Sequence, residues 1–337
     1  MKAIVIREFG GPNVMKLEEV ATPEPGPGEV LIKVHAVSVN RTLDIKVRAG
    51  QYARPVKLPL VPGVDPSGVV VKLGPGVTER KVGDRVTVAL RLGDGNSGAD
   101  AIRLLGVHAW GGYAEYVRAI AANTTIVPES VDFATATVVT RHAPTALHLL
   151  QDHAKVQSGE WVLVMGAAGG LGSSGVQVSK YLGAKVIAAA GADDRVKVGL
   201  DLGADAGVNY RAQDLTAEVL RITGGGGVNV VFENIGDPAL FPKAFAALAR
   251  RGRLVTAGGH GGGTVPLDVN KLYLNQITVM GATGERPDSA KLVLEMASAG
   301  RFKALIDRVL PLSQAALAHE LVESRGGIGK VVLDPTQ

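Results

Sequence analysis

The chain has 337 residues, which is enough for two domains of ordinary size, each with a core of its own. Its formal net charge of +4 is spread along the chain and aromatic residues make up only 4% of it, so we expect neither a nucleic-acid-binding nor a membrane-surface role. The absence of cysteine from the sequence excludes disulfides, thiolate nucleophiles and cysteine-ligated zinc.

The N-terminal residues alternate like a β-strand and reach Glu8 after a short apolar stretch, unlike a signal peptide. No segment approaches the ~20 apolar residues that a membrane span needs. We therefore expect a soluble, cytoplasmic protein.

The first part of the chain, up to about residue 130, predicts an antiparallel β region with Gly- and Pro-marked turns. Residues 91–108 show the least regular pattern, and we expect a long surface loop there. The predicted strands are residues 2–7, 30–39, 67–73, 85–90 and 114–120.

From about Phe133 onward, short apolar runs alternate with helix-length segments, a pattern typical of an α/β, doubly wound parallel sheet buried on both faces. After Gly284 the pattern predicts helix, strand, helix and strand. The predicted strands are 161–165, 185–190, 228–233, 253–257, 277–281, 306–310 and 330–333, and the predicted helices are 170–182, 215–223, 289–299 and 314–324.

A glycine-rich turn lies between the strand at 161–165 and the helix that follows it, which is the context of a dinucleotide pyrophosphate site. Gly166 permits the sharp turn, Gly169 lets the backbone approach phosphate, and Gly172 lets the helix pack on the strand. The alternative is a glycine-rich turn without a ligand. The candidate cofactor-binding residues here are Gly166, Ala168, Gly169, Gly170, Leu171 and Gly172.

The next strand ends at Gly191 without an acidic residue, which favours NADPH over NADH, because a carboxylate there would bind the 2′-hydroxyl of NADH and repel a 2′-phosphate. Arg195 follows and is placed to pair with the phosphate. In the alternative reading, Asp193 or Asp194 caps the next helix, Arg195 is a solvated charge, and NADH is the cofactor.

In their order along nearly the whole chain, several motifs together resemble the medium-chain dehydrogenase/reductase superfamily, and within it the zinc-free quinone oxidoreductases similar to zeta-crystallin. The resemblance implies a GroES-like substrate domain (residues 1–130 and 284–337) and a Rossmann domain (131–283). It also implies cofactor contacts from Tyr210, Asn234, Gly258 and Lys330, although Tyr210 and Lys330 could equally be surface groups. The matching motifs are residues 28–33, 61–63, 81–86, 111–117, 167–172, 202–204, 208–210 and 329–332.

Zinc-dependent members of the superfamily are similar too, but none of their metal positions is kept. The first zinc ligand corresponds to Asn40, a Gly-His-Glu triplet to Gly63-Val64-Asp65, and the third ligand to Arg141. The region of the structural zinc, residues 91–106, has no cysteine. One extra residue between Asn40 and Gly50 leaves that alignment uncertain by one position. We therefore expect no zinc, although residues 106–112 are closer to zinc alcohol dehydrogenases.

Without a Lewis acid, a conjugated carbonyl is easier to reduce than a simple ketone, so the leading hypothesis is an NADPH-dependent reductase of quinones or α,β-unsaturated carbonyl compounds. The resemblance points to Asn40 and Tyr52 as hydrogen-bond donors to the carbonyl, while Tyr52 could instead pack at an edge near Val56 and Leu58. Arg141 would stabilise the oxyanion or bind an anionic group, or else pair with Asp65.

Two other functions stay open: an alcohol dehydrogenase-like oxidoreductase that works without zinc, and a non-catalytic NADPH-binding structural or sensor protein. His142, His148 and His153 lack the i, i+4 spacing of a helical metal pair, so we expect core or surface histidines. The expected partner is a small-molecule substrate. The strand at 277–281 could be a sheet edge, which makes a homodimer sensible.

Overall fold

The computed structural model describes residues 1–92, 103–286, 288–324 and 326–337. It divides into two compact units, which we call unit 1 (Met1–Arg141 with Ala290–Gln337) and unit 2 (His142–Ser289). The first division falls inside helix α2 (Phe133–Leu147), later than the boundary expected from the sequence. The reason is that Val138 packs with Ala36 and Val332 of unit 1.

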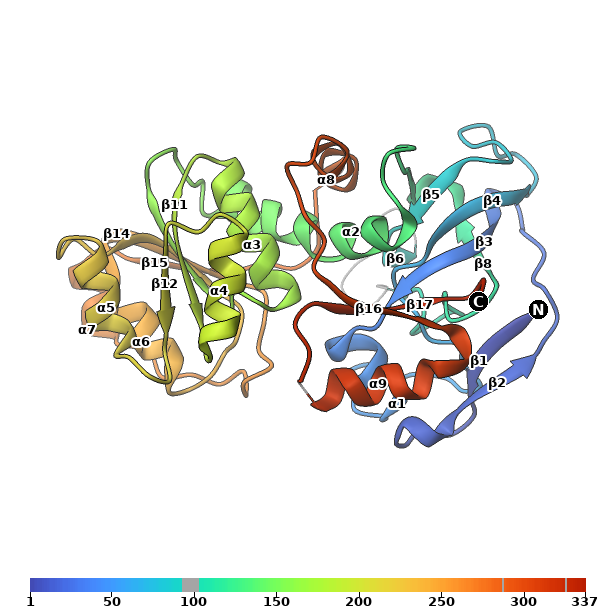
Figure 1. The fold of residues 1–337 in the computed structure, drawn as a ribbon, viewed down its shortest axis with the longest axis horizontal. Coiled ribbons are helices and arrows are strands. Elements are labelled where there is room, and N and C mark those ends of the chain that lie inside the picture. Colours follow the sequence, from blue (N-terminus) through green and yellow to red (C-terminus); the bar gives the residue numbers. More distant parts are fainter. Residues whose placement is uncertain (93–102, 287, 325) are drawn as a thin grey trace. The chain divides into compact units, whose positions relative to one another are not determined.

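A mainly antiparallel sheet forms unit 1, with strand order β16-β17-β3-β4-β5-β9 and with β8 also paired to β3 among the described residues. The C-terminal β17 pairs antiparallel with β3, so the two ends of the chain build one sheet, seen as red beside blue in Figure 1. Its strands are β3 (Glu29–Ser38), β4 (Ser67–Leu73), β5 (Arg85–Val88), β8 (Tyr116–Ile120), β9 (Thr124–Ile126), β16 (Ile306–Pro311) and β17 (Lys330–Asp334).

Around this sheet lie two antiparallel pairs and several short helices. Within the predicted loop at 91–108, Arg91–Leu92 and Arg103–Leu104 pair as β6 and β7, and residues 93–102 lie outside the described residues. The elements are β1 (Lys2–Ile6), β2 (Met15–Glu19), β6 (Arg91–Leu92), β7 (Arg103–Leu104), η1 (Pro12–Val14), η4 (Ala121–Asn123), η6 (Leu312–Gln314), α8 (Ser289–Ser298) and α9 (Ala315–Ser324).

Directly after β3 the chain forms a π-helical turn, η2 (Arg41–Ile45), which continues into α1 (Lys46–Arg48). The amide of Ile45 donates to the carbonyl of Asn40, an i to i+5 bond of 3.2 Å. A π turn holds one more residue than an α turn. The stretch in which the sequence has its extra residue thus contains a turn that is one residue wider, and Asn40 directly precedes that turn.

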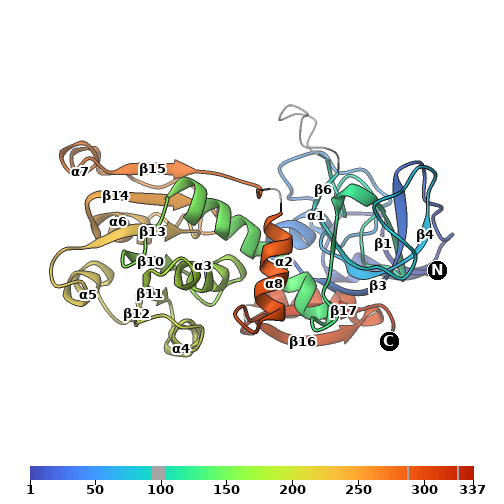
Figure 2. The same cartoon turned by 90° about the horizontal axis from the view of Figure 1, so that it is seen from above.

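Unit 2 contains a six-stranded parallel sheet, ordered β12-β11-β10-β13-β14-β15 among the described residues and visible in that order in Figure 2. The chain starts at the centre with β10, builds outward to β12, and returns to add β13, β14 and β15 on the other side. The strands are β10 (Trp161–Met165), β11 (Lys185–Ala190), β12 (Ala206–Asn209), β13 (Val228–Glu233), β14 (Leu248–Thr256) and β15 (Thr278–Gly281).

Helices cover this sheet in two groups. α3 contacts both α4 and the π-helical turn η5, while α5 contacts α6. Connections between parallel strands are right-handed. The chain adds strands in one direction from β10 to β12 and in the other direction from β13 to β15, so the helices of the two halves lie on opposite faces of the sheet. Burial on both faces explains why β10 is wholly apolar and why the centre of β13, residues 230–232, is apolar. The elements are η5 (His148–His153), α3 (Gly170–Tyr181), α4 (Asp193–Asp201), α5 (Leu215–Ile222), α6 (Leu240–Ala246) and α7 (Val269–Leu274).

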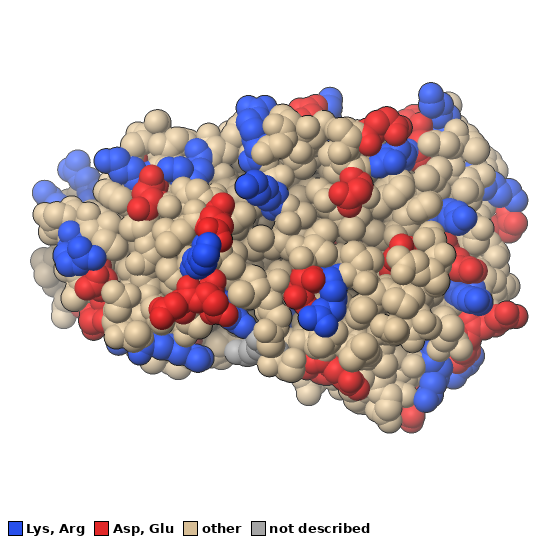
Figure 3. All heavy atoms as spheres, in the orientation of Figure 1, with Lys and Arg blue, Asp and Glu red and all other residues tan. Residues whose placement is uncertain are grey.

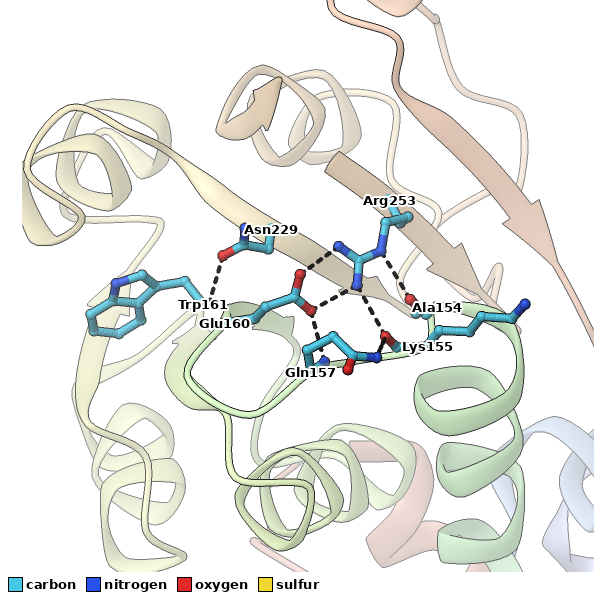
Figure 4. Close-up of polar contacts among 7 residues, drawn as sticks. All are labelled: Ala154, Lys155, Gln157, Glu160, Trp161, Asn229 and Arg253. Atoms are coloured by element: carbon cyan, nitrogen blue, oxygen red, sulfur yellow. Dashed lines mark hydrogen bonds and ion pairs between the residues drawn. The ribbon is translucent and has the colours of Figure 1, made fainter. Parts of the chain in front are cut away.

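The segment that leads from η5 into β10 is held to β14 by one ion pair (Figure 4). Arg253 donates to both carboxylate oxygens of Glu160, at 2.8 and 2.7 Å, and its Nε donates to the carbonyl of Ala154 at 2.9 Å. Burial alone would raise the pKa of Glu160, but the hydrogen bonds from Arg253 and from the Gln157 amide outweigh it, and the pKa is lowered. This pair therefore anchors the amino end of the central strand.

Lys and Arg lie interspersed with Asp and Glu on the face drawn in Figure 3. Across the described ranges, no helix is both long and apolar enough to span a lipid bilayer.

Candidate cofactor site and active site

The glycine-rich turn of unit 2 joins β10 to α3. Gly166 has φ of 65°, a left-handed conformation that favours glycine. A Cβ on Gly172 would lie 2.1 Å from the carbonyl oxygen of Gly166, so only glycine allows α3 to come this close to the turn. Gly169 precedes the helix, and no side chain caps its first turn. The first amides of α3 and the helix dipole are thus available to an anion such as a pyrophosphate.

Two further turns meet this one at the carboxyl edge of the sheet. Asn234, after β13, donates from Nδ2 to the carbonyl of Met165 at 2.5 Å. A Cβ on Gly258, after β14, would lie 2.1 Å from the carbonyl oxygen of Asn234. The sheet reverses its strand order between β10 and β13, and this is where ligands of doubly wound sheets bind. Asn234 and Gly258 therefore shape the edge next to the glycine-rich turn.

Glu233 closes the turn after β13. Its carboxylate accepts from the amides of Ile235, at 2.9 Å, and of Gly236, at 3.0 Å. The side chain is buried, and burial raises its pKa despite these bonds. The two amides hold the carboxylate against its own turn, so Glu233 has a structural role here.

At the end of β11, the space beside Gly191 is bordered by Tyr210 and Arg211. A Cβ placed on Gly191 would lie 3.2 Å from the Tyr210 hydroxyl oxygen and 3.2 Å from Arg211 Nε. Tyr210 was predicted from the sequence, whereas Arg211, which directly follows the motif at 208–210, was not. Both lie where the 2′-substituent of an adenosine ribose is recognised in this fold.

The acidic residues after Gly191 do not cap α4, so the capping role considered for Asp193 or Asp194 is wrong. The N-cap residue is Ala192, with no side-chain cap. Asp193 accepts a hydrogen bond from Asn209 Nδ2 at 2.7 Å, and Asp194 accepts one from the amide of Arg195 at 2.8 Å. Both carboxylates lie in the first turn of α4, where the helix dipole favours negative charge.

Unit 1 contains a polar cluster next to the end of β3, which we call the Asn40 cluster. It consists of the buried residues Ser38, Asn40, Asp44 and Asp65 and the half-buried Lys330. Lys330 Nζ donates to Asn40 Oδ1 at 2.7 Å. Asn40 Nδ2 donates to Asp65 Oδ2 at 2.9 Å, and the Ser38 hydroxyl donates to the same oxygen at 2.5 Å. Asp44 accepts from the amides of Asn40 and Gly63, at 2.8 and 3.0 Å.

The charges of the Asn40 cluster perturb one another. Burial, followed by the nearby carboxylate of Asp65, raises the pKa of Asp44. Burial lowers the pKa of Lys330 and the charge of Arg141 lowers it further, while Asp65 and Asp44 act in the opposite sense. Arg141 therefore lies near enough to add its fixed charge to this cluster.

Arg141 has no ion pair with Asp65, so the pairing that the sequence left open is not formed. The Asp65 carboxylate is occupied by Ser38 and Asn40. Within the described ranges, Arg141 Nε is buried and has no hydrogen-bond partner. An unsatisfied buried donor on a cation is costly unless a ligand pairs with it. Arg141 is therefore a candidate for binding an anionic or developing negative group.

Tyr52 is half-buried and, like Val56 and Leu58, packs against the hydrophobic core of unit 1. This placement agrees with the packing role that the sequence left open, and it leaves the catalytic role a prediction.

Comparison with known proteins supports an oxidoreductase. Residues 26–129 match the family described as alcohol dehydrogenase GroES-like domain, and residues 170–299 match the zinc-binding dehydrogenase family. The human quinone oxidoreductase is 31% identical over 343 residues, which cover 99% of this chain and 97% of the relative.

Two solved structures show the same fold. An NAD-dependent alcohol dehydrogenase is 35% identical with a TM-score of 0.91 over 99% of both chains. A mycobacterial protein in complex with NADPH is 31% identical with a TM-score of 0.83, over 99% of this chain and 100% of that one. The chain belongs to the medium-chain dehydrogenase/reductase superfamily. Its GroES-like and Rossmann domains, expected from the sequence, are confirmed.

The residues of this dehydrogenase/reductase do not fit the zinc that one matched family name implies. At the three positions given by the resemblance, the Asn40 amide is engaged at both ends, Val64 has no donor atom, and the Arg141 guanidinium cannot ligate a metal. In the part of the chain that the structure describes, no group of three or more His, Cys, Asp or Glu side chains could hold a metal ion.

Sequence reasoning missed much of the Asn40 cluster in this dehydrogenase/reductase. Asp44 and Ser38 were not singled out. Lys330 was expected to contact the cofactor, which stays a prediction, and in the structure its ammonium group donates to Asn40 Oδ1 and to the carbonyl of Val39. A detectable signal was the acid four residues after Asn40, since Asp44 accepts from the Asn40 amide. No local pattern links Lys330 to Asn40.

Proposed function

We propose that this protein is an NADPH-dependent reductase of quinones or α,β-unsaturated carbonyl compounds that works without zinc. The proposal rests mainly on the contacts within the Asn40 cluster. By the resemblance, Asn40 and Arg141 stand at two of the positions where zinc-dependent relatives hold their metal. The Asn40 amide is satisfied by Lys330 and Asp65, whereas Arg141 Nε is buried without a hydrogen-bond partner among the described residues. A conjugated acceptor needs less polarisation than a simple ketone, so such a site suits it better.

The choice of NADPH rests on the end of β11. The strand ends at Ala190 and is followed by Gly191 in place of an acid, and Tyr210 and Arg211 border the space beside Gly191. A guanidinium there would pair with a 2′-phosphate, as Arg195 was predicted to do. The glycine-rich turn would hold the pyrophosphate on the amides of α3. The bound cofactor would supply the hydride.

The chain's own residues would stabilise the product of that transfer. When hydride reaches the β carbon of an enone, negative charge develops on the carbonyl oxygen. We assign its stabilisation to the Arg141 guanidinium and the Tyr52 hydroxyl, both hydrogen-bond donors. The amide hydrogens of Asn40 are already donated to Asp65 and Ser38. We therefore assign Asn40 a positioning role, in which it orients Lys330, in place of the substrate contact that we first predicted.

The decisive experiment measures NADPH and NADH oxidation by the purified protein with quinones, enones and enoyl thioesters. We expect turnover with NADPH and at least tenfold lower kcat/KM with NADH. Tight NADPH binding without turnover of any acceptor would instead indicate a structural or sensor protein. A higher kcat/KM with NADH than with NADPH would contradict the assignment of NADPH as the cofactor.

An alcohol dehydrogenase is the second candidate, favoured by the likeness to the NAD-dependent enzyme described above. Alcohol oxidation assayed with and without added zinc separates the two. We expect zinc to have no effect, because the donor set does not fit it. Alcohol oxidation that appears on adding zinc would favour the dehydrogenase.

The role of Arg141 can be tested by Arg141→Ala. We expect kcat/KM for several enones to fall roughly 10- to 1,000-fold, mainly through kcat, because a charge aimed at the oxyanion acts in the transition state. Arg301→Ala, an exposed arginine of the same unit, is the control and should leave kcat/KM unchanged. Unchanged efficiency in Arg141→Ala would overturn the assignment.

Cofactor choice can be tested separately by Arg211→Ala. We expect KM for NADPH to rise about tenfold and KM for NADH to stay the same, since one charge-assisted hydrogen bond contributes about 1.5–3 kcal/mol. Arg221→Ala on the exposed face of α5 is the matched control. Equal changes in KM for NADPH and NADH would mean that Arg211 does not bind the 2′-phosphate.

A further inference from the structure

The π-helical turn η5 in unit 2 brings two histidines together. His148 Nε2 and His153 Nε2 lie 3.1 Å apart, with ring centroids separated by 4.5 Å and ring planes at 80°. In an α-helix, residues five apart point about 140° away from each other around the axis. The i to i+5 bond from the amide of Ala154 to the carbonyl of Leu149, at 2.8 Å, shows the wider turn that aligns them.

Asp152 orients the first of these rings. Its Oδ2 lies 2.9 Å from His148 Nδ1, and its Oδ1 lies 3.3 Å from a guanidinium nitrogen of Arg286. A carboxylate accepts hydrogen bonds, so the Nδ1 of His148 carries the proton. In the neutral ring, Nε2 then keeps its lone pair and accepts a hydrogen bond from His153 Nε2 at 3.1 Å, and a bound metal ion would take the place of that one proton. This carboxylate–histidine arrangement is the one that orients imidazole ligands in metal sites.

The spacing of the two nitrogens matches a pair of adjacent metal ligands. With metal–nitrogen bonds of about 2.0–2.1 Å, ligands separated by 90° to 109° lie roughly 2.9–3.3 Å apart. The observed 3.1 Å falls inside this range. His148 and Asp152 are about a quarter exposed, so water can complete the coordination.

The turn is also held in place before any ion binds. Arg253 donates to the carbonyl of Ala154, directly after His153, and is itself fixed by both oxygens of Glu160 (Figure 4). The guanidinium of Arg286 donates to the second carboxylate oxygen of Asp152 and to the side-chain oxygen of Gln151. Little ordering is therefore needed on binding, which favours affinity.

From this geometry we propose that His148 and His153 form a binding site for a divalent transition metal ion, such as Ni²⁺, Cu²⁺ or Zn²⁺, with Asp152 as the residue that positions His148. Imidazole ligands suit these ions. The site is separate from the proposed reductase chemistry. It lies before the amino end of β10, whereas the dinucleotide turn follows the carboxyl end of that strand.

The test uses the full, untagged chain freed of metal with a chelator. Titration calorimetry with Ni²⁺ should show one bound ion per chain, and the electron paramagnetic resonance spectrum with one equivalent of Cu²⁺ should show coupling to two imidazole nitrogens. His148→Ala and His153→Ala should each weaken binding more than tenfold and remove one nitrogen. Asp152→Ala should weaken binding 10- to 100-fold while both nitrogens remain.

His35→Gln, which alters a histidine of unit 1 that stacks on Phe133, is the control and should bind the ions like the wild type. Circular dichroism and NADPH binding check that each variant is folded. No stoichiometric Ni²⁺ or Cu²⁺ binding by the wild type would leave only a hydrogen-bonded histidine pair and overturn the proposal. Binding that persists unchanged in folded His148→Ala and His153→Ala would overturn it as well.

Discussion

Single side chains in unit 1 show how burial sets protonation. His319 is fully buried between Arg48 and Tyr113, with Nδ1 3.3 Å from an Arg48 nitrogen and Nε2 3.2 Å from the Tyr113 hydroxyl. A guanidinium can only donate, so Nδ1 accepts and Nε2 carries the proton. Burial, and then the charge of Arg48, lower the pKa of His319 to about 3. The fold therefore requires a neutral His319.

This histidine predicts a loss of stability in acid. Its ordinary pKa is 6.5 and its folded pKa is about 3, so below pH 6.5 the unfolded chain binds a proton that the folded chain does not. The stabilisation is complete above pH 6.5 and declines as the pH falls toward 3. Between pH 7 and 4.5 we expect His319→Gln to lose about 2–3 kcal/mol less of its free energy of unfolding than the wild type.

Glutamine can still accept from Arg48 and donate to Tyr113, but it does not titrate. Urea unfolding at several pH values, followed by circular dichroism, measures the difference. A gap between wild type and variant that is the same at pH 7 and pH 4.5 would show that His319 does not titrate between the two states.

Among the elements, the regular strands and the glycine-rich turn could be predicted from local pattern. β4, β10, β11 and β13 have the bounds expected from the sequence, because their apolar runs are short and are bounded by turn residues. The π turns η2 and η5 could not be predicted, because side-chain pairs in a helix are normally expected at the α-helical spacings of three and four residues. His148 and His153 are five residues apart, so we did not predict that they would meet.

Gly172 offers a test of the glycine-rich turn. In Gly172→Ala the added Cβ would meet the Gly166 carbonyl oxygen at 2.1 Å, so α3 must move away from the turn. We expect NADPH affinity to fall more than tenfold and the melting temperature to drop, measured by fluorescence titration and thermal unfolding.

Gly226→Ala is the matched control, because its Cβ would come no closer than 3.5 Å to another group and its φ is not left-handed. NADPH affinity in Gly172→Ala equal to that of this control would argue against pyrophosphate binding at the turn.

At the scale of the whole molecule, we propose that β15 mediates a homodimer. β15 lies at the edge of the sheet, as the sequence predicted for residues 277–281. Near it in the chain, the side chains of Tyr273 and Leu274 on α7 are 62% and 64% exposed. An unpaired edge beside exposed apolar groups favours pairing with a second copy about a two-fold axis.

We expect light scattering coupled to size exclusion to give twice the chain mass for the wild type and the chain mass for Leu274→Lys, which places a charge in the apolar contact. Leu200→Lys on α4, also exposed, is the control and should stay dimeric. A monomeric wild type, or a dimeric Leu274→Lys, would contradict an interface at this edge.

The sequence by itself determined the features that depend on neighbouring residues: the strands, the glycine-rich turn, and the lack of zinc ligands at Asn40, Val64 and Arg141. Only the tertiary structure decided which distant groups meet. Lys330 binds Asn40 across 290 residues because β17 pairs with β3. Burial in that shared core, which no local pattern encodes, then sets the charges of the Asn40 cluster.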